Sequence, residues 1–430
     1  MTVLVDATPT PLSSAGAREG AFGNATHLVC RACGEQSPLG PFYACLECFG
    51  PLEVGYSYPS ITRAEIEAGP RSIWRYASLL PVPADIATYP STDPGFTRLV
   101  DAGNLAADLG LRKLWVKDDS GNPTHSFKDR VVAVALSAAR ELGFKVLACP
   151  STGNLANAVA AAAARAGITS VVFVPENLEQ QKILASAVYD TTLVAVQGSY
   201  DDVNKLASEI AGEEDSWAFV NVNVRPYYAE GSKTLAYEIA EQLGWRLPDQ
   251  IVIPVASGAQ LTKIDKGIGE LVRLGLVEDK PVKIYGAQAT GCSPIAQAYR
   301  AGHDVVAPVK PDTIAKSLAI GNPADGPYVL DVVRRTGGLI ADVDDRAVVQ
   351  NIRRLARTEG IFAETAGGVT VGVTAKLIAD GVLDPEAETV VINSGDGLKT
   401  LDAIASEVGP KTTIAPRYEA FVDFWKEYRG

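Results

Sequence analysis

The chain has 430 residues, 47% of them hydrophobic, which is enough for two or three domains with sizeable cores. Its net charge of −12 and its lack of any basic cluster argue against nucleic acid or an anionic membrane as the main partner, because both require concentrated Lys and Arg. A small anionic substrate would be held by a few well-placed cations.

The N-terminal segment gives no sign of export or membrane insertion. The first 25 residues lack the basic, apolar and cleavage regions of a signal peptide, and the longest apolar run, Leu155–Ala164, falls short of the roughly 20 residues that span a bilayer. We therefore expect a cytoplasmic protein. Residues 1–25 are rich in Ala, Gly, Ser and Thr, which predicts a loosely ordered extension.

Four cysteines follow in a pattern typical of zinc sites. Two Cys-x2-Cys pairs stand eleven residues apart, and a glycine comes shortly after each pair. This spacing predicts a zinc ribbon over residues 26–56, with two disulfides or a site that has lost its metal as alternatives. Four thiolates leave no open coordination position, so the metal would be structural. The predicted ligands are Cys30, Cys33, Cys45 and Cys48.

A lysine at the start of a predicted helix is the main candidate for chemistry. Lys128 follows a turn-forming Asn122-Pro123 pair and precedes the apolar run Val131–Leu136. A lysine at the mouth of a helix that packs into a core can form a Schiff base with an aldehyde cofactor when its surroundings favour the neutral amine. The alternative is a lysine that only begins a helix.

From Lys113 onward, β-rich runs alternate with amphipathic ones, which is typical of parallel sheets covered by helices on both faces. So many strands favour two sheets over one. The predicted strands are Lys113–Val116, Val146–Ala148, Ser170–Val174, Thr192–Val196, Ala218–Val222, Ile251–Val255, Lys283–Gly286 and Thr389–Ile392. The predicted helices between them include Asn154–Ala166, Leu178–Val188, Asp202–Ala211, Ala229–Leu243 and Ala347–Thr358.

Three segments of small residues follow predicted strands: Ser151–Asn154, Ser257–Gln260 and Asn393–Gly397. The first two open helices, where free backbone N–H groups and the helix dipole attract anions. Neither is a dinucleotide fingerprint or a P-loop, and each alone is compatible with tight helix packing. Because ligands bind at the carboxyl ends of parallel strands, we expect these segments and Lys128 to converge.

The segment Asn122–Arg130 (NPTHSFKDR) closely resembles the cofactor-lysine motif of threonine synthases, which are pyridoxal-phosphate enzymes of the tryptophan-synthase-β fold type. The resemblance covers nearly the whole chain in the same order, ribbon included. It continues through Ser151–Asn157 (STGNLAN), Asn223–Thr234 (NVRPYYAEGSKT), Cys292–Pro294, Ile320–Gly326 (IGNPADG), Glu364–Gly368 (ETAGG) and Gly397–Thr400 (GLKT).

This resemblance implies an α/β fold class with two doubly wound sheet domains and an N-terminal zinc ribbon. Residues 57–142 and 242–430 would form the large cofactor-binding domain, and residues 143–241 a smaller domain that closes on substrate. The resemblance also implies a homodimer.

The resemblance further implies roles for residues at the cofactor. Lys128 would bind pyridoxal phosphate as a Schiff base and move protons, Asn154 would donate to the ring hydroxyl, and Ser394 would meet the pyridine nitrogen. The cofactor phosphate would be held by a turn in which many relatives have Gly-Asn-x-Gly-Asn. This chain departs from that sequence, so backbone N–H groups rather than side-chain amides would bind the phosphate. That turn is formed by Ser257, Gly258, Ala259, Gln260 and Leu261.

Threonine synthases act on O-phospho-L-homoserine, so a second phosphate site is implied. Lys117 matches a substrate-phosphate lysine of the family, and Arg225 has a fork geometry suited to phosphate. The hydroxyls of Ser126, Ser151 and Thr152 would add donors. The chain departs from common relatives at Leu155, Tyr228 and Asp396, which bears on the substrate more than on the reaction class.

Two other functions remain open from the sequence. One is a diverged enzyme of the same fold, such as a threonine or serine dehydratase or a synthase that uses phosphoserine; Lys117 and Arg225 favour a phosphorylated substrate instead. The other is a regulatory or nucleic-acid-binding module carried by the ribbon. The acidic net charge, and Arg31 as the only basic residue within Cys30–Cys48, argue against that module.

Overall fold

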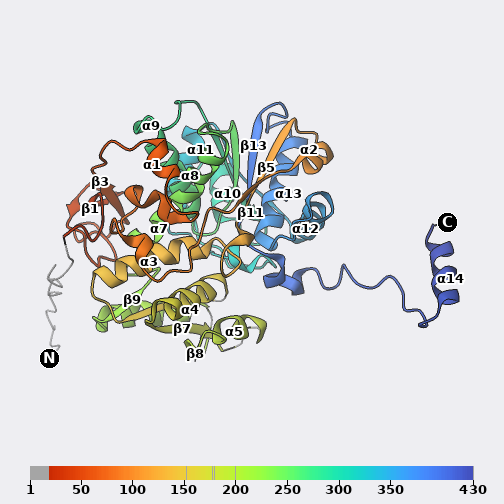
Figure 1. Cartoon of the computed structure of the whole chain (residues 1–430), viewed down its shortest axis with the longest axis horizontal. Helices are drawn as coiled ribbons and strands as arrows, with labels where there is room; N and C mark the ends of the chain where they lie inside the picture. The colour runs from red at the N-terminus through yellow and green to blue at the C-terminus, as the bar shows by residue number, and fades with distance from the viewer. Residues whose placement is uncertain (1–18, 152, 177, 179, 199, 430) are drawn as a thin grey trace.

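The computed structural model describes residues 19–429, except residues 152, 177, 179 and 199. Its strands form three sheets within this part of the chain (Figure 1). None of the helices in the described residues is both long and apolar enough to cross a membrane.

The N-terminal sheet is antiparallel, with strand order β2-β1-β3. It consists of β1 (Ala25–Cys30), β2 (Gln36–Ser37) and β3 (Leu52–Tyr56). The second sheet has the order β12-β11-β10-β13-β5-β4 and is parallel except for the edge strand β4. Its strands are β4 (Arg98–Asp101), β5 (Lys113–Asp118), β10 (Gln250–Pro254), β11 (Lys283–Ala289), β12 (Ile340–Val343) and β13 (Glu388–Asn393).

The third sheet is parallel, with the order β8-β7-β6-β9. Its strands are β6 (Val146–Pro150), β7 (Thr169–Pro175), β8 (Thr192–Val196) and β9 (Trp217–Phe219). The central strands of both parallel sheets are mostly buried, as expected where helices cover both faces. All five residues of β10 and all six of β13 are buried. The predicted fold class with two doubly wound sheets is therefore confirmed.

Helices cover the two parallel sheets, and each sheet with its helices forms one lobe. Helix α3 lies between the two lobes (Figure 1). The first helices are α1 (Arg63–Glu67), α2 (Gly103–Leu109), α3 (Lys128–Glu141), α4 (Asn154–Ala166), α5 (Gln180–Ala187), α6 (Tyr200–Glu213) and α7 (Arg225–Glu230). The remaining helices are α8 (Lys233–Gln242), α9 (Ala259–Arg273), α10 (Pro294–Arg300), α11 (Gly326–Arg335), α12 (Asp345–Glu359), α13 (Thr365–Ala379) and α14 (Tyr418–Arg429).

The helix predicted over Ala229–Leu243 is two helices in the structure, α7 and α8. The break falls at Gly231, where the backbone passes so close to α3 that a Cβ would lie 2.7 Å from the Arg130 carbonyl oxygen. Real side chains do not tolerate such a contact, so the glycine permits the close approach. The helix pair therefore presses directly on the first turn of the lysine-bearing helix.

Part of the N-terminal segment is ordered against the core. Residues 1–18 of the predicted loose extension lie outside the described residues, but Ala21 and Phe22 are buried. The Phe22 ring stacks on Tyr227 at 5.1 Å between centroids. The prediction of a loose extension over residues 1–25 is therefore wrong for this stretch, because a partner about 200 positions away is invisible to local composition.

The ribbon segment is tied to the body by buried ion pairs. Glu53 of β3 pairs with Lys263 of α9, and the Tyr56 hydroxyl donates to Glu230 Oε2 at 2.6 Å. Glu230 also pairs with Lys263 at 2.8 Å and is fully buried. Buried charges that lose their partners are costly, so this cluster fixes the ribbon against α7 and α9. Predicted domain boundaries at residues 56, 142 and 241 remain predictions.

Candidate active site

Three loops meet at one edge of the six-stranded sheet. Strand β13 lies between β10 and β5 and runs parallel to both. The segments after these three strands therefore share the carboxyl edge: Ser257–Gln260 after β10, Ser394–Gly397 after β13, and the loop to Lys128 after β5. The sequence predicted that these two small-residue segments and Lys128 would converge; the other predicted segment, Ser151–Asn154, follows β6 of the four-stranded sheet.

The loop before Lys128 is joined to the loop after β13. Phe127 N donates to the Ser394 carbonyl at 2.9 Å, and Asp396 N donates to the His125 carbonyl at 3.0 Å. These bonds place the first residue of α3 beside Ser394. The Lys128 side chain is half-buried, and its Nζ lies 4.8 Å from the centre of the Phe127 ring. Within the described residues, Nζ makes no hydrogen bond or salt bridge that would hold it away from a ligand.

The electrostatics of Lys128 suit a nucleophilic amine. Burial lowers the pKa of Lys128 to about 8, and the Glu364 carboxylate opposes this shift. Desolvation disfavours the ammonium form, so a useful fraction of the amine is neutral near neutral pH. Schiff-base chemistry requires that neutral form.

Glu364 is a functional candidate to which the sequence analysis assigned no role. It caps the start of α13 and is buried, and its two oxygens accept from two predicted cofactor residues. Ser394 Oγ donates to Oε1 at 2.9 Å, and Asn154 Nδ2 donates to Oε2 at 2.9 Å. Because Asn154 begins α4 of the other lobe, this carboxylate bridges the two sheets. The signal was an acidic residue directly before a helix of small apolar residues.

Gly395 makes room for this carboxylate. A Cβ at Gly395 would lie 2.7 Å from Glu364 Cδ, well inside the distance that real side chains show. The Glu364 backbone N–H also donates to the Gly395 carbonyl at 3.0 Å. The loop after β13 is therefore shaped around Glu364 as well as around Lys128.

The turn before α9 is fit to hold a phosphate. Gly258 caps α9 in the left-handed region (φ 103°), and in the described part of the chain no side chain caps the free N–H groups of the first turn. Gln260 Nε2 is buried without a hydrogen-bond partner among the described residues. Buried polar atoms are normally paired, so the free amide and the open helix end suit an anion. Leu261 is fully buried and anchors the turn.

A buried ion network fixes the start of α3 two residues beyond Lys128. Arg130 Nη2 lies 2.7 Å from Asp119 Oδ1, and the same guanidinium pairs with Glu238. Lys117 Nζ donates to Glu238 Oε2 at 2.6 Å, to the Thr97 carbonyl at 2.8 Å and to Gln242 Oε1 at 3.0 Å. All four charged side chains are fully buried.

This network bears on the predicted phosphate role of Lys117. An ammonium has three donors, and all three of Lys117 are engaged by protein acceptors. Burial also lowers the pKa of Lys117, although Glu238 opposes the shift. The geometry therefore favours a structural role for Lys117 over contact with a substrate.

The predicted substrate-binding hydroxyls differ in whether they already have hydrogen-bond partners. Ser126 Oγ is buried without a partner among the described residues, and it lies beside Gly395 in a β-bridge. Ser151 Oγ accepts from the backbone N–H of Gly153 and of Ala156 at 3.2 and 3.0 Å, so it already caps the turn into α4. Thr152 lies outside the described residues.

Arg225 is linked to the turn before α9 through Asp325. Its Nη2 lies 2.7 Å from Asp325 Oδ2, and its side chain is 26% exposed. The Asp325 backbone N–H donates to the Ser257 carbonyl at 2.9 Å. Arg225 therefore lies near the turn before α9 and keeps donors that Asp325 does not use.

Lys399 is a second cation that the sequence analysis did not single out. Its Nζ donates to Asn157 Oδ1 at 2.8 Å, and Asn157 stands one turn after Asn154 on the same face of α4. Burial lowers the pKa of Lys399, against the opposing charges of Glu364, Asp129 and Asp396. The residue lies within the Gly397–Thr400 motif, which was the available signal.

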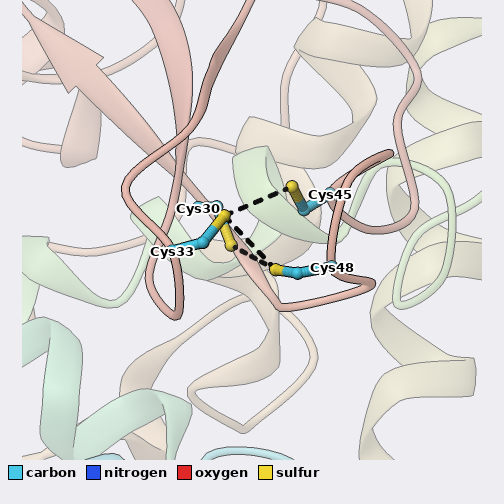
Figure 2. Close-up of side chains that lie close together, drawn as sticks. All are labelled: Cys30, Cys33, Cys45 and Cys48. Carbon is cyan, nitrogen blue, oxygen red and sulfur yellow. Dashed lines mark hydrogen bonds between the residues drawn. The ribbon is translucent and has the colours of Figure 1, made fainter.

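The four ribbon cysteines converge on one point, as Figure 2 shows. Their Sγ atoms all lie within 4.8 Å of one another. The Cys33–Cys48, Cys30–Cys48 and Cys33–Cys45 distances are 3.3, 3.4 and 3.8 Å. A tetrahedral zinc with Zn–S bonds of about 2.3 Å separates its sulfurs by about 3.8 Å, so the four thiols fit such an ion.

The fold, the half-buried Lys128 at the carboxyl edge of the sheet and the open turn before α9 are the features of a site that can hold pyridoxal phosphate. Residues 91–395 match the family described as pyridoxal-phosphate dependent enzyme. The chain belongs to this family.

Curated relatives narrow the assignment. The chain is 36% identical to the threonine synthase of Methanocaldococcus jannaschii over 87% of this chain and 93% of the relative. It is 35% identical to the threonine synthase of Methanosarcina acetivorans over 92% of this chain and 97% of the relative. Within its family the chain therefore belongs to the threonine synthases, as its motifs indicated.

Solved structures agree on the fold. Maize serine racemase, 22% identical, superimposes with a TM-score of 0.62 and covers 81% of this chain and 96% of its own. A processed threonine deaminase from Solanum lycopersicum, also 22% identical, gives 0.61 over 75% of this chain and 92% of its own. At this identity the likeness shows the fold alone.

The Lys128 environment gives a prediction about pH. In the cofactor-free protein, the rate at which pyridoxal phosphate reacts with Lys128 should rise with pH through a midpoint near 8, because only the neutral amine attacks. Glu364→Gln removes a charge that raises the Lys128 pKa, so the midpoint should move to lower pH. Stopped-flow absorbance across pH 6–10 measures this. If the midpoint of the pH dependence is unchanged or higher in the variant, Glu364 does not have the assigned effect on the Lys128 pKa.

Proposed function

We propose that this chain converts O-phospho-L-homoserine and water to L-threonine and phosphate by β,γ-elimination and replacement. The observation that carries the proposal is that Glu364 binds Asn154 and Ser394 beside the start of α3, which carries Lys128, at the same sheet edge as the open turn before α9. The threonine synthase relatives support the same reaction. Bound pyridoxal phosphate would supply the electron sink that stabilises the substrate carbanion.

The residues of the chain would bind the cofactor and move protons. Lys128 would hold the cofactor covalently and then carry the proton of the substrate α-carbon. Asn154 would donate to the ring hydroxyl, and Ser394 would meet the ring nitrogen with a neutral hydroxyl. Residues Ser257–Leu261 would hold the cofactor phosphate through backbone N–H groups and Gln260 Nε2. Glu364 would fix Asn154 and Ser394 in place.

The substrate phosphate would meet cations that the fold leaves available. Because Lys117 is fully paired, we assign this task to Arg225 and Lys399, with Ser126 Oγ as a hydroxyl donor. Arg225 presents a planar fork suited to phosphate oxygens. A phosphate held between α7, α4 and the loop after β13 would favour a closed arrangement of the smaller domain over the large one and would exclude water.

The decisive assay is phosphate release from O-phospho-L-homoserine, with amino-acid analysis of the product. One threonine per phosphate is the expected result. Consumption of threonine, serine or phosphoserine, with O-phospho-L-homoserine left untouched, would overturn the threonine synthase assignment and favour a dehydratase or a phosphoserine-using synthase. Arg225→Met should raise KM more than it lowers kcat, since it removes binding contacts.

We also propose a structural zinc at Cys30, Cys33, Cys45 and Cys48, in a protein that works in the reducing cytoplasm. Zinc content by mass spectrometry should be near one ion per chain. Cys33→Ser should lose the ion and lower the melting temperature, because the ribbon would no longer hold Glu53 and Tyr56 against the body. Cys149→Ala, in the core, should keep the zinc. Full zinc content in Cys33→Ser would contradict the site.

A further inference from the structure

The C-terminal helix α14 stands well away from the rest of the chain at the end of an extended segment (Figure 1). Ile404 is the last buried residue of the body, and every residue from 405 to 419 is exposed. A helix of twelve residues is marginal by itself in water. The C-terminal arm, residues 405–429, therefore needs a contact beyond its own backbone for α14 to be a stable helix.

One face of α14 carries a row of aromatic side chains. Tyr418, Phe421, Trp425 and Tyr428 follow the 3-4-3 spacing of a heptad seam, and their exposed fractions are 74%, 45%, 38% and 58%. The rings of Phe421 and Trp425 lie 6.0 Å apart, and those of Trp425 and Tyr428 lie 5.7 Å apart. An exposed aromatic seam of this kind is typical of a helix that binds another surface.

The aromatic rows of two α14 helices match each other when the helices run antiparallel. The 3-4-3 spacing reads the same in both directions, so an antiparallel pair sets Tyr418 against Tyr428 and Phe421 against Trp425 of the second copy. Such a two-fold contact uses one patch on both chains and closes without further growth.

We propose that α14 pairs antiparallel with α14 of a second copy of this chain. Burial of four aromatic side chains on each helix would remove on the order of 1,000 Å² from water. That area is near the lower limit for specific interfaces, so the arms form a weak contact unless other surfaces also join the two chains. The proposal is independent of the reaction, because no site residue lies on the arm.

Cysteine cross-linking across the seam tests both the contact and its direction. One preparation carries Tyr418→Cys and a second, with a mass tag, carries Tyr428→Cys. Mixed at protein concentrations on the order of 100 µM and oxidised mildly, they should form the mixed disulfide about fivefold more than either forms its own dimer. The wild-type chain, treated in parallel, reports any background from its own exposed cysteines, Cys33 and Cys48.

Two matched substitutions show that the helix face carries the contact. Phe421→Asp in both cross-linking partners should abolish the mixed disulfide, whereas Asp423→Ala, on the opposite face, should leave it unchanged. If Tyr418→Cys instead cross-links to itself in preference, the antiparallel arrangement is wrong. If none of the pairs exceeds the wild-type background, α14 does not pair with a second copy, and the proposal falls.

Discussion

Replacing Lys128 with alanine is expected to abolish the absorption near the visible edge that marks the cofactor-loaded protein, and to lower the rate of phosphate release by at least about 10³-fold. The substitution removes both the covalent attachment and the group that moves the proton. Lys128 lies at the start of α3 beside Ser394, and within the described residues no salt bridge diverts its amine. Absorbance spectra and the phosphate assay measure the two effects separately.

Two controls separate chemistry from folding. Lys128→Arg keeps the positive charge but cannot form a Schiff base, so it should lose the band as fully as the alanine variant. Lys145→Ala changes an exposed lysine just beyond α3 and should keep both band and activity. All three proteins should show the same far-ultraviolet circular dichroism. A Lys128→Ala protein that retains the band would end the assignment of this site.

Strand and helix periodicity predicted most of the fold correctly. Thr192–Val196 and Asn154–Ala166 coincide with β8 and α4, because a run of β-branched and apolar residues and an alanine-rich helix each leave a strong local signal. Strands β4 and β12 were missed. Each has only four residues and includes an aspartate, and each is an edge strand whose existence depends on a neighbour far away in the sequence.

The site was predictable where chemistry shows in local sequence. Lys128, Asn154 and Ser394 stand in short motifs next to strand ends, and the structure brings all three together. The roles of Glu364 and Lys117 could not be predicted from the sequence. A carboxylate that serves residues 210 and 30 positions away, and a lysine neutralised by an acid 121 positions away, cannot be recognised from neighbours in the chain.

The acid that neutralises Lys117 carries the largest expected effect on stability. Glu238 accepts from Lys117, from two Arg130 nitrogens, and from the backbone N–H of Phe96 and Thr97. Glu238→Gln keeps the shape but removes the charge, leaving two buried cations against Asp119 alone. We expect a loss of 3–5 kcal/mol, about the cost of breaking a buried pair, in urea unfolding.

A matched exposed pair provides the control. Asp380 lies 2.9 Å from Lys376 on the surface of α13, with both side chains nearly half exposed. Asp380→Asn should therefore change the free energy of unfolding by less than about 1 kcal/mol. If Glu238→Gln behaves like Asp380→Asn, the network does not hold the fold as described.

Acid should affect the wild type and the Glu238→Gln variant differently. Burial alone would raise the pKa of Glu238, but Arg130 and Lys117 hold it at about 2, below the usual value near 4.3. The contribution of Glu238 to the free energy of unfolding is thus complete above pH 5 and is lost as pH falls toward 2, whereas the variant should lack this part of the acid sensitivity.

Arg130 stands two residues after Lys128, so the Glu238→Gln variant should also bind pyridoxal phosphate more weakly at neutral pH. Loss of stability with unchanged cofactor affinity would mean that the network supports the core but does not position the lysine.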